Sequence, residues 1–451
     1  MVNASREPSI DSKPVRYGAQ RLFRDAGWMT AATVGSAVFG AAFWALAARI
    51  YPPAQMGVAT AIIAVINAVG AVVASVAGDP YTALFPAVGS ARRQIYRLGR
   101  RRQWMLSSVA GLVSGIAVIW LLPEVRGSLA VGALVAIGVV VWSSSYVQYK
   151  ALIAVGQARW TPVSQVLISL GRVLLLPLFV VTIGWHSPEL AFIASAAVVV
   201  IVFMRPISRF VSSPDGWPAE ATLSDEQAVK TFKKLSTQMV VNAALAWGPP
   251  FVSPFVVTVI AGPTQGAFFA LCFTFTQLID IVTGALSWSL AVHASSQPEQ
   301  SRSMARTVLI RMVGIAILGF ICLFFVVPVA LPWLNPQYGG MKIGEVIALL
   351  CAASVARCFY QAWSDLQLSR RKMLQPLIAN VVGAIALFSL MPYFANTYGA
   401  VGGAAAFLAL RLAGAFSAGI FLLFSKPSRQ PVDSVSAGSD ENRTDDGSAS
   451  C

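Results

Sequence analysis

The stretch 27-GWMTAATVGSAVFGAAFWALAARIYPPAQMGVATAIIAVINAVGAVVASVAG-78 decides the fold. It consists of two apolar runs separated by Tyr51-Pro52-Pro53, and it contains a single charged residue, Arg49. A helix of about 20 apolar residues crosses the hydrocarbon core of a bilayer. The stretch therefore predicts two membrane-spanning helices joined by a short turn.

The same pattern continues along the chain. Of its 451 residues, 56% are hydrophobic and 12% are charged, whereas a soluble domain carries about 25% charged residues. The sequence therefore predicts an all-α integral membrane protein with about twelve transmembrane helices. The predicted spans are residues 27–48, 57–78, 104–122, 129–152, 162–184, 188–204, 238–260, 266–292, 307–331, 343–366, 374–395 and 400–424.

Basic residues gather in alternate loops. The formal net charge is +14, and the loops after spans two, six, eight and ten carry most of it. Basic loops face the cytoplasm and anionic lipid, so we expect both termini in the cytoplasm. The clusters are too short and too separated to form a nucleic-acid groove. The residues concerned in these loops are Arg92, Arg93, Arg97, Arg100, Arg101, Arg102, Arg205, Arg209, Lys230, Lys233, Lys234, Arg302, Arg306, Arg370, Arg371 and Lys372.

The chain is predicted to divide into two related lobes of six helices each. YVQYKALIAVGQARWTP at 146–162 matches YQAWSDLQLSRRKMLQP at 360–376 in its Tyr, Leu and Pro, and PPAQMG at 52–57 matches GPTQG at 262–266. Six helices per lobe give a parallel repeat, related by a pseudo-twofold along the membrane normal; chance similarity between apolar helices is the alternative. The predicted parts are a basic N-terminal segment (1–26), an N-terminal lobe (27–204), a cytoplasmic linker (205–237), a C-terminal lobe (238–424) and a disordered cytoplasmic tail (425–451).

No motif indicates catalysis or a cofactor. The sequence contains no GxxxxGK phosphate loop and no HExxH, and its two histidines and five cysteines lack metal-site spacing. We therefore expect no catalytic residue, no cofactor and no metal.

Ionisable residues within the apolar spans are the main functional signal, because a charge near the bilayer centre is costly unless it faces protein or water. Arg172, Arg357 and Arg411 are candidates to line a cavity that attracts a phosphorylated ligand, since guanidinium groups suit phosphate; pairing between helices is the alternative. Asp280 is either an ion-coupling site or the partner of an arginine. Lys150, Asp79 and Asp365 lie near predicted helix ends, where we expect their side chains to extend to the interface.

Polar and aromatic residues recur at matching places in the two lobes. They make the inner halves of spans four and ten polar, and amides lie in spans seven and eight. Aromatic faces beside hydrogen-bonding groups suit sugars, although Trp and Tyr also anchor helices at interfaces. The Gly248-Pro249-Pro250 segment predicts a break in span seven. The substrate-binding candidates of this kind are Tyr146, Gln148, Asn242, Gln277, Tyr360, Gln361 and Trp363.

Four features resemble the Wzx-like polysaccharide flippases of the multidrug/oligosaccharidyl-lipid/polysaccharide (MOP) exporter superfamily. They are the opening 48-ARIYPPAQMGVATA-61 after a basic segment, the six-plus-six repeat, the basic 370-RRK-372 after span ten, and 397-TYGAVGGAAAF-407 at the start of the last span. The resemblance implies a MATE-like fold of two lobes. It also implies a cationic cavity and alternating access.

The function implied by the resemblance is a flippase, not an enzyme, for polyprenyl-pyrophosphate-linked oligosaccharide in cell-surface polysaccharide biosynthesis at the bacterial plasma membrane. Its expected partners are the lipid-linked oligosaccharide, membrane lipids, and a polysaccharide polymerase or glycosyltransferases. Two alternatives stay open: a drug or metabolite cation antiporter of the same superfamily, and a membrane-embedded glycan transferase or polymerase. The buried arginines disfavour a structural scaffold, because they cost stability without a use.

Overall fold

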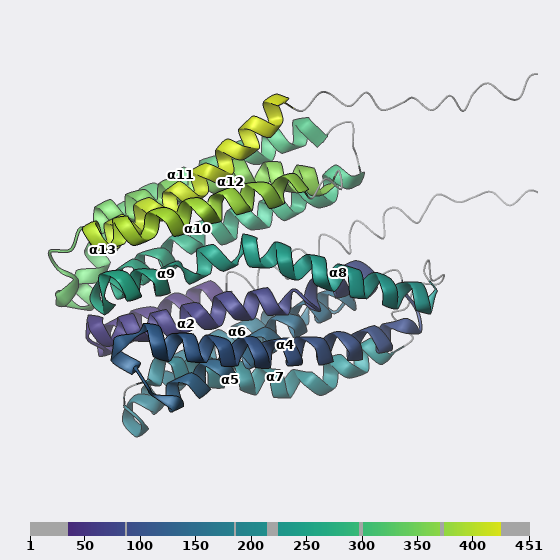
Figure 1. The fold of residues 1–451 in the computed structure, drawn as a ribbon, viewed down its shortest axis with the longest axis horizontal. Helices are drawn as coiled ribbons and strands as arrows, with labels where there is room; N and C mark the ends of the chain where they lie inside the picture. Colours follow the sequence, from purple (N-terminus) through teal and green to yellow (C-terminus); the bar gives the residue numbers. More distant parts are fainter. Residues whose placement is uncertain are drawn as a thin grey trace, which may run out of the picture.

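A computed structural model describes residues 35–85, 88–184, 186–213, 224–296, 301–369 and 374–424. Within these ranges the regular elements are helices, drawn in Figure 1 as a long bundle. In chain order they are Gly35–Ile50, α2 (Pro53–Ala74), α3 (Gly78–Leu84), α4 (Ala91–Leu121), η2 (Pro123–Val125), α5 (Leu129–Ala154), α6 (Trp160–Thr182), α7 (Ser187–Ser212), α8 (Asp225–Ala246), α9 (Gly248–Ala261), α10 (Pro263–Ser296), α11 (Ser301–Leu334), η5 (Pro336–Tyr338), α12 (Ile343–Ser369) and α13 (Leu374–Phe424).

The all-helical membrane fold predicted from the sequence is confirmed. Within the described residues, nine helices are long and apolar enough to cross a membrane, and ten if the bent pair α8 and α9 is one span. The predicted number is higher for two reasons. The described part of the first span, Gly35–Ile50, is short, and the last two predicted spans form the single element α13.

The element α13 is a helical hairpin. Its 51 residues would extend about 75 Å as a straight helix, more than twice the thickness of a hydrocarbon core. The backbone turns at Gly399, where φ is 60° and ψ is −134°, a conformation that glycine adopts without steric cost. Gly383 faces Leu410 across the hairpin, and the two arms lie side by side in Figure 1. The predicted break between spans eleven and twelve thus lies at this glycine.

Apolar side chains cover the outside of the bundle. Val181 on α6 is 86% exposed, and Trp333 on α11 is 75% exposed. In water, an apolar surface this extensive would drive association. Its solvent is therefore hydrocarbon, as the composition indicated.

The observed loops are shorter than the predicted ones, because several helices extend beyond the predicted spans. The arginines from Arg92 to Arg102, assigned to a loop, lie on the first turns of α4. The linker predicted for 205–237 is largely helical: α7 continues to Ser212, and α8 begins at Asp225 behind a Ser224 capping box. Predictions for 1–34, 214–223, 370–373 and 425–451 fall outside the described residues.

We call the helices from Gly35–Ile50 to α7 the first half of the chain and those from α8 to α13 the second half. At one end of the bundle the two halves are in close contact, and we call this the closed end. Helix α2 packs against α9 and α10, and a Cβ atom on Gly57 would lie 1.8 Å from the carbonyl oxygen of Pro263. The Asn335 amide of the second half donates to the carbonyl oxygens of Ala48 (3.1 Å) and Tyr51 (3.4 Å) in the first half.

At the opposite end, α8 of the second half packs against the first half. Phe232 stacks on Tyr81 with ring centroids 6.1 Å apart, and the Ser236 hydroxyl donates to the Val76 carbonyl oxygen at 2.6 Å. The chain then bends by 43° around Trp247, which lies between α8 and α9. The break predicted from Gly248-Pro249-Pro250 therefore lies between a segment that contacts the first half and one that leads to the closed end.

The contact at Gly57 predicts a packing penalty with a matched control. We expect Gly57→Ala to lower the thermal unfolding midpoint in detergent, because the backbone of Pro263 has to move away. Overpacking of this kind costs about 1–3 kcal/mol. Gly40→Ala, on the preceding helix, adds a methyl group with nothing within 4 Å and is expected to leave the midpoint unchanged or higher, because alanine favours helix. Equal midpoints for the two variants would contradict this account of the closed end.

Candidate substrate cavity

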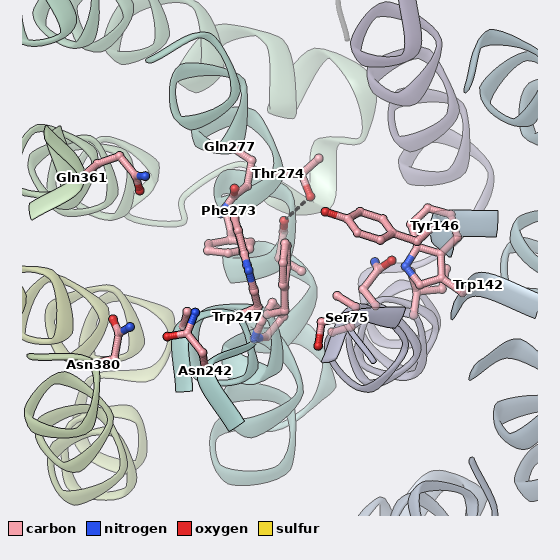
Figure 2. Close-up of a pocket in the computed structure, with 18 of the residues that line it drawn as sticks. Ser75, Trp142, Tyr146, Asn242, Trp247, Phe273, Thr274, Gln277, Gln361 and Asn380 are labelled. Carbon is pink, nitrogen blue, oxygen red and sulfur yellow. Dashed lines mark hydrogen bonds between the residues drawn. The ribbon is translucent and has the colours of Figure 1, made fainter. Parts of the chain in front are cut away.

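A cavity of about 570 Å³ lies between the two halves, beneath the closed end. The first half contributes residues from Gly35–Ile50, α2, α3, α5, α6 and α7, and the second half contributes residues from α8, α9, α10, α12 and α13. Figure 2 shows side chains from both halves around this space, with Tyr146 and Trp142 on one side and Asn380 and Gln361 on the other. A ligand in the cavity would contact both halves at once.

Helices α2 and α10 present matching faces to the cavity. Gln55 and Gln265 are the glutamines of the two matching segments 52–57 and 262–266. Each of four cavity residues on α2 has a counterpart on α10 at the same separation along the sequence, and these counterparts also line the cavity. A parallel repeat would place equivalent faces around the centre in this way. The division into two six-helix lobes stays a prediction. The residues concerned are Thr60, Ile63, Ala64 and Asn67 on α2, and Ala270, Phe273, Thr274 and Gln277 on α10.

Aromatic rings and amides make up much of the lining. Five of the seven polar and aromatic candidates from the sequence line the cavity: Tyr146, Asn242, Gln277, Tyr360 and Gln361. Trp247 and Asn380 also line it, as do Trp142 and Asn67, which the sequence did not single out. Ring faces beside amide donors and acceptors are suited to a ligand with both C–H and hydroxyl surfaces.

Two candidates point elsewhere. The Gln148 side chain donates to the Val200 carbonyl oxygen at 2.9 Å, so it joins α5 to α7. Trp363 is 3% exposed and stacks on Phe421 of α13, with ring centroids 5.6 Å apart. Both side chains therefore pack between helices, and neither lines the cavity.

Arg172 on α6 brings a positive charge to the first-half wall. Its guanidinium lies 4.0 Å from the centroid of Phe192 and 5.1 Å from that of Trp142. Within the described residues, no carboxylate lies within ion-pair distance of it, and its Nε is buried without a hydrogen-bond partner. Ring faces stabilise a cation but leave its charge uncompensated, so Arg172 can receive an anionic group.

Three charged residues predicted at the membrane interface line the cavity instead. Lys150 Nζ lies 3.3 Å from the Asp79 carboxylate and 5.7 Å from the centroid of Tyr146. Asp365 accepts hydrogen bonds from the Ser287 hydroxyl and the Gln361 amide. The prediction that these side chains extend to the interface is therefore wrong. The sequence could have predicted that Lys150 lines the cavity, because Trp142, Tyr146 and Lys150 are spaced four residues apart on α5 and so share one face of that helix.

Asp280 lies between two arginines in a side pocket of about 70 Å³ next to the cavity. Its Oδ2 is 3.6 Å from Arg357 Nε and 3.5 Å from Arg411 Nη2, and Arg357 Nη1 also donates to the Asp280 carbonyl oxygen at 3.0 Å. Of the two alternatives for Asp280, this geometry favours the arginine partner. The three side chains together carry one positive charge, and the side pocket shares Trp247, Gln277 and Tyr360 with the cavity.

The cavity and its side pocket together are weakly cationic. Basic side chains outnumber acidic ones by one, and the amides around them are neutral. Within the described residues, no group of three or more His, Cys, Asp or Glu side chains could hold a metal ion. The charged residues of the two spaces are Lys150, Arg172, Arg357 and Arg411 against Asp79, Asp280 and Asp365.

Solved structures share this fold. The chain is similar to the lipid II flippase MurJ in an inward closed conformation, with a TM-score of 0.63 and 14% identity over 88% of this chain and 87% of that chain. It is also similar to a MATE protein in the straight conformation, with a TM-score of 0.57 and 13% identity over 88% of this chain and 95% of that chain. A third is an inward-facing MATE family transporter of the MOP superfamily, with a TM-score of 0.51 and 14% identity over 88% and 93% of the two chains.

These similarities confirm the MATE-like membrane fold predicted from the sequence. At 13–14% identity they show the fold alone. No protein-family model and no curated protein matches the sequence.

The cluster around Asp280 predicts an asymmetry between its members. We expect Asp280→Asn to destabilise the protein by about 3–5 kcal/mol, because it leaves two buried guanidinium groups without a counter-charge. Arg411→Gln should cost much less, because Asp280 keeps its contact with Arg357. Thermal unfolding midpoints in detergent measure both effects. Arg411→Gln being as harmful as Asp280→Asn would show that the carboxylate does not hold the two arginines together.

Proposed function

We propose that this protein is a membrane flippase that moves a polyprenyl-pyrophosphate-linked oligosaccharide across the bilayer for cell-surface polysaccharide biosynthesis, by alternating access. The observation that carries the proposal is the cavity between the two halves, with Arg172 on one wall, unpaired by any described carboxylate, and the Arg357–Asp280–Arg411 cluster beside the other. Its structural neighbours, a lipid II flippase and MATE transporters, support transport of some kind.

Arginine is the expected contact for the pyrophosphate. Guanidinium groups bind phosphate oxygens through paired hydrogen bonds, and these are stronger than neutral ones. Arg172 has no competing carboxylate among the described residues, so it is the first candidate contact. Arg357 and Arg411 share Asp280 and can offer one further net positive charge.

The sugar would occupy the aromatic and amide surface. Asn242, Gln277 and Asn380 provide donors and acceptors, while Trp142 and Trp247 provide ring faces. The cavity volume of about 570 Å³ lies within the ~300–1,000 Å³ that encloses drug-sized ligands. This favours a short oligosaccharide over a finished polymer. The prenyl chain would stay in the lipid, where the apolar outer surface of the bundle is exposed.

We place the protein in the bacterial plasma membrane, with both termini in the cytoplasm and the closed end outside. The exposed basic residues Arg93, Arg97, Arg205, Arg209 and Lys233 lie at the end of the bundle where α4 and α8 begin and α7 ends. That distribution agrees with the positive-inside rule. Each elementary charge that crosses 100 mV of membrane potential supplies ~2.3 kcal/mol, so the potential is a sufficient source of energy.

The two alternative functions fit the cavity less well. A cation antiporter needs an accessible carboxylate, but Asp280 is shared by two arginines and Asp79 is paired with Lys150. The third cavity carboxylate, Asp365, is 5% exposed and accepts hydrogen bonds from Ser287 and Gln361. A transferase would be expected to gather catalytic groups in a long loop outside the membrane. At the closed end the described connections are short turns, such as the one between Leu121 and Leu129. Transport without chemistry is therefore the function we propose, and a polymerase or glycosyltransferases would be its partners.

The role of Arg172 can be tested in cells that lack the protein. We expect a complete lipid-linked oligosaccharide to accumulate on their cytoplasmic leaflet, and wild type to reverse this. Arg172→Ala should reduce the flipping rate by about 10- to 100-fold, because a hydrogen bond to a charged group contributes ~1.5–3 kcal/mol. Arg172→Lys keeps the charge and should recover part of the activity. The amount of each variant in the membrane is measured alongside the leaflet distribution.

Arg126→Ala is the matched control, because Arg126 is an exposed arginine after η2, outside the cavity. It should restore export fully. If cells without the protein keep normal lipid intermediates but lose efflux of cationic drugs, the flippase proposal is wrong and the antiporter is favoured.

A further inference from the structure

A second cavity, of about 240 Å³, lies at the closed end within the first half. The turn that leads into α2, the short helix η2 and the start of α7 surround it. Its polar lining consists of Tyr51, Gln55, Glu124, His186 and Glu189. Among the described residues that line it, two are acids and none is a lysine or an arginine.

Glu189 is an unusual residue to find here, because its carboxylate is 1% exposed. Oε1 lies 3.2 Å from His186 Nδ1, and Oε2 is buried without a hydrogen-bond donor among the described residues. A buried carboxylate needs a counter-charge, a proton, hydrogen bonds or a helix N-terminus to compensate it. The described lining residues include no lysine or arginine, so the N-terminus of α7, where Glu189 lies in the first turn, and a proton on His186 are the compensations available. Histidine is the side chain that ordinarily gains a proton between pH 5 and 8.

Tyr51 connects this pair to the contact between the two halves. Its hydroxyl donates to the Gly184 carbonyl oxygen at 2.9 Å, beside His186, and the Ser187 hydroxyl donates to the same oxygen. Burial raises the pKa of the Tyr51 phenol, and the Glu189 carboxylate raises it further, so the phenol remains a donor. The Tyr51 carbonyl oxygen accepts from Asn335 of the second half. A movement at the His186–Glu189 pair would therefore reach the inter-half contact through one residue.

The corresponding turn in the second half, residues 397–407, has no counterpart of the His186–Glu189 pair. There Gln265, the counterpart of Gln55, accepts a hydrogen bond from the backbone N–H of Ala400 at 3.1 Å, at the turn of the α13 hairpin. The segment 397-TYGAVGGAAAF-407 contains no acidic residue and no histidine. A turn of this kind therefore does not require a histidine or an acidic side chain. The need to form the turn does not explain why His186 and Glu189 are buried together in the first half.

We propose that His186 and Glu189 form a proton-binding site open to the outer solution, and that proton uptake there keeps the closed end shut. The orientation toward the outer solution rests on the proposed function. The proton makes the imidazole cationic, and its hydrogen bond to the Glu189 carboxylate becomes charge-assisted and stronger. Without the proton, Glu189 is buried beside a neutral imidazole and near the negative Glu124, with the phenol of Tyr51 as the other titratable group. This state favours separation of the pair.

The site would couple protons to the transport cycle. The closed state holds the proton more tightly than a state in which the pair has separated, so acid shifts the population toward closure. After the head group leaves, an outer proton would close the outer end and return the cavity to the cytoplasmic side. A divalent metal is a poor alternative ligand, because no group of three His, Cys, Asp or Glu side chains occurs among the described residues.

The test measures the distance across the closed end in the full-length protein without substrate. Spin labels are attached at Arg126→Cys in the first half and Gln337→Cys in the second, both exposed positions, with Cys322 and Cys451 replaced by Ser. In lipid nanodiscs we expect the long-distance population to grow as the pH rises from about 5.5 to about 8, the range over which histidine loses its proton. His186→Gln and Glu189→Gln should each abolish this pH dependence.

Glu345→Gln is the control, because Glu345 is an exposed acid at the start of α12 that pairs with Lys342 outside the cavity. It should keep the full pH dependence. The proposal is overturned if wild-type distances ignore pH, if both site variants still respond, or if the distances follow replacement of Na⁺ by choline at constant pH. Should His186→Gln fail to fold, Glu189→Gln alone decides. No substrate is present, so failure of the flippase assay would leave this result unaffected.

Discussion

The cost of placing a charge in hydrocarbon governs the arrangement of this protein. Each ionisable residue within a span has to find a counter-charge, a ring face or a polar space. Asp280 meets Arg357 and Arg411, Lys150 meets Asp79, and Arg172 lies against Phe192. All of these groups lie in or beside one cavity, while the outer surface presents side chains such as Val181 and Trp333 to lipid. The requirement that excludes charge from the surface therefore also concentrates it at the centre.

The sequence was informative wherever a single helix decides the outcome. Hydropathy predicted the spans, and Gly248-Pro249-Pro250 predicted the break before α9, because both signals depend only on neighbouring residues. It failed at the helix ends: the arginines at the start of α4 continue a helix that has already left the membrane, where hydropathy no longer follows helical structure. Contacts between distant helices were also beyond it. That Asp280 of α10 would meet arginines of α12 and α13 depends on how three helices pack.

The direction in which an individual side chain points was also difficult to predict from the sequence. Tyr146 and Gln148 are two positions apart, which places them about 200° apart around α5. One lines the cavity and the other bonds to Val200 of α7. Composition singled out both, but the four-residue recurrence of Trp142, Tyr146 and Lys150 distinguishes them. On α2 and α10, a comparison of matching positions in the two halves would have identified cavity-lining residues more directly, because those positions face the same cavity.

The packing of α8 has a consequence for the order in which the chain can mature. Phe232 and Ala228 of α8 belong to the same buried apolar cluster as Tyr81, Phe85 and Ile95 of the first half. A nascent chain that has been inserted only as far as Ser212 therefore lacks part of its own interior. The insertion machinery has to deliver α8 before the helices of the first half can finish packing. The first half is completed by the second, so a gene divided at the junction would yield a first product with an uncovered Tyr81.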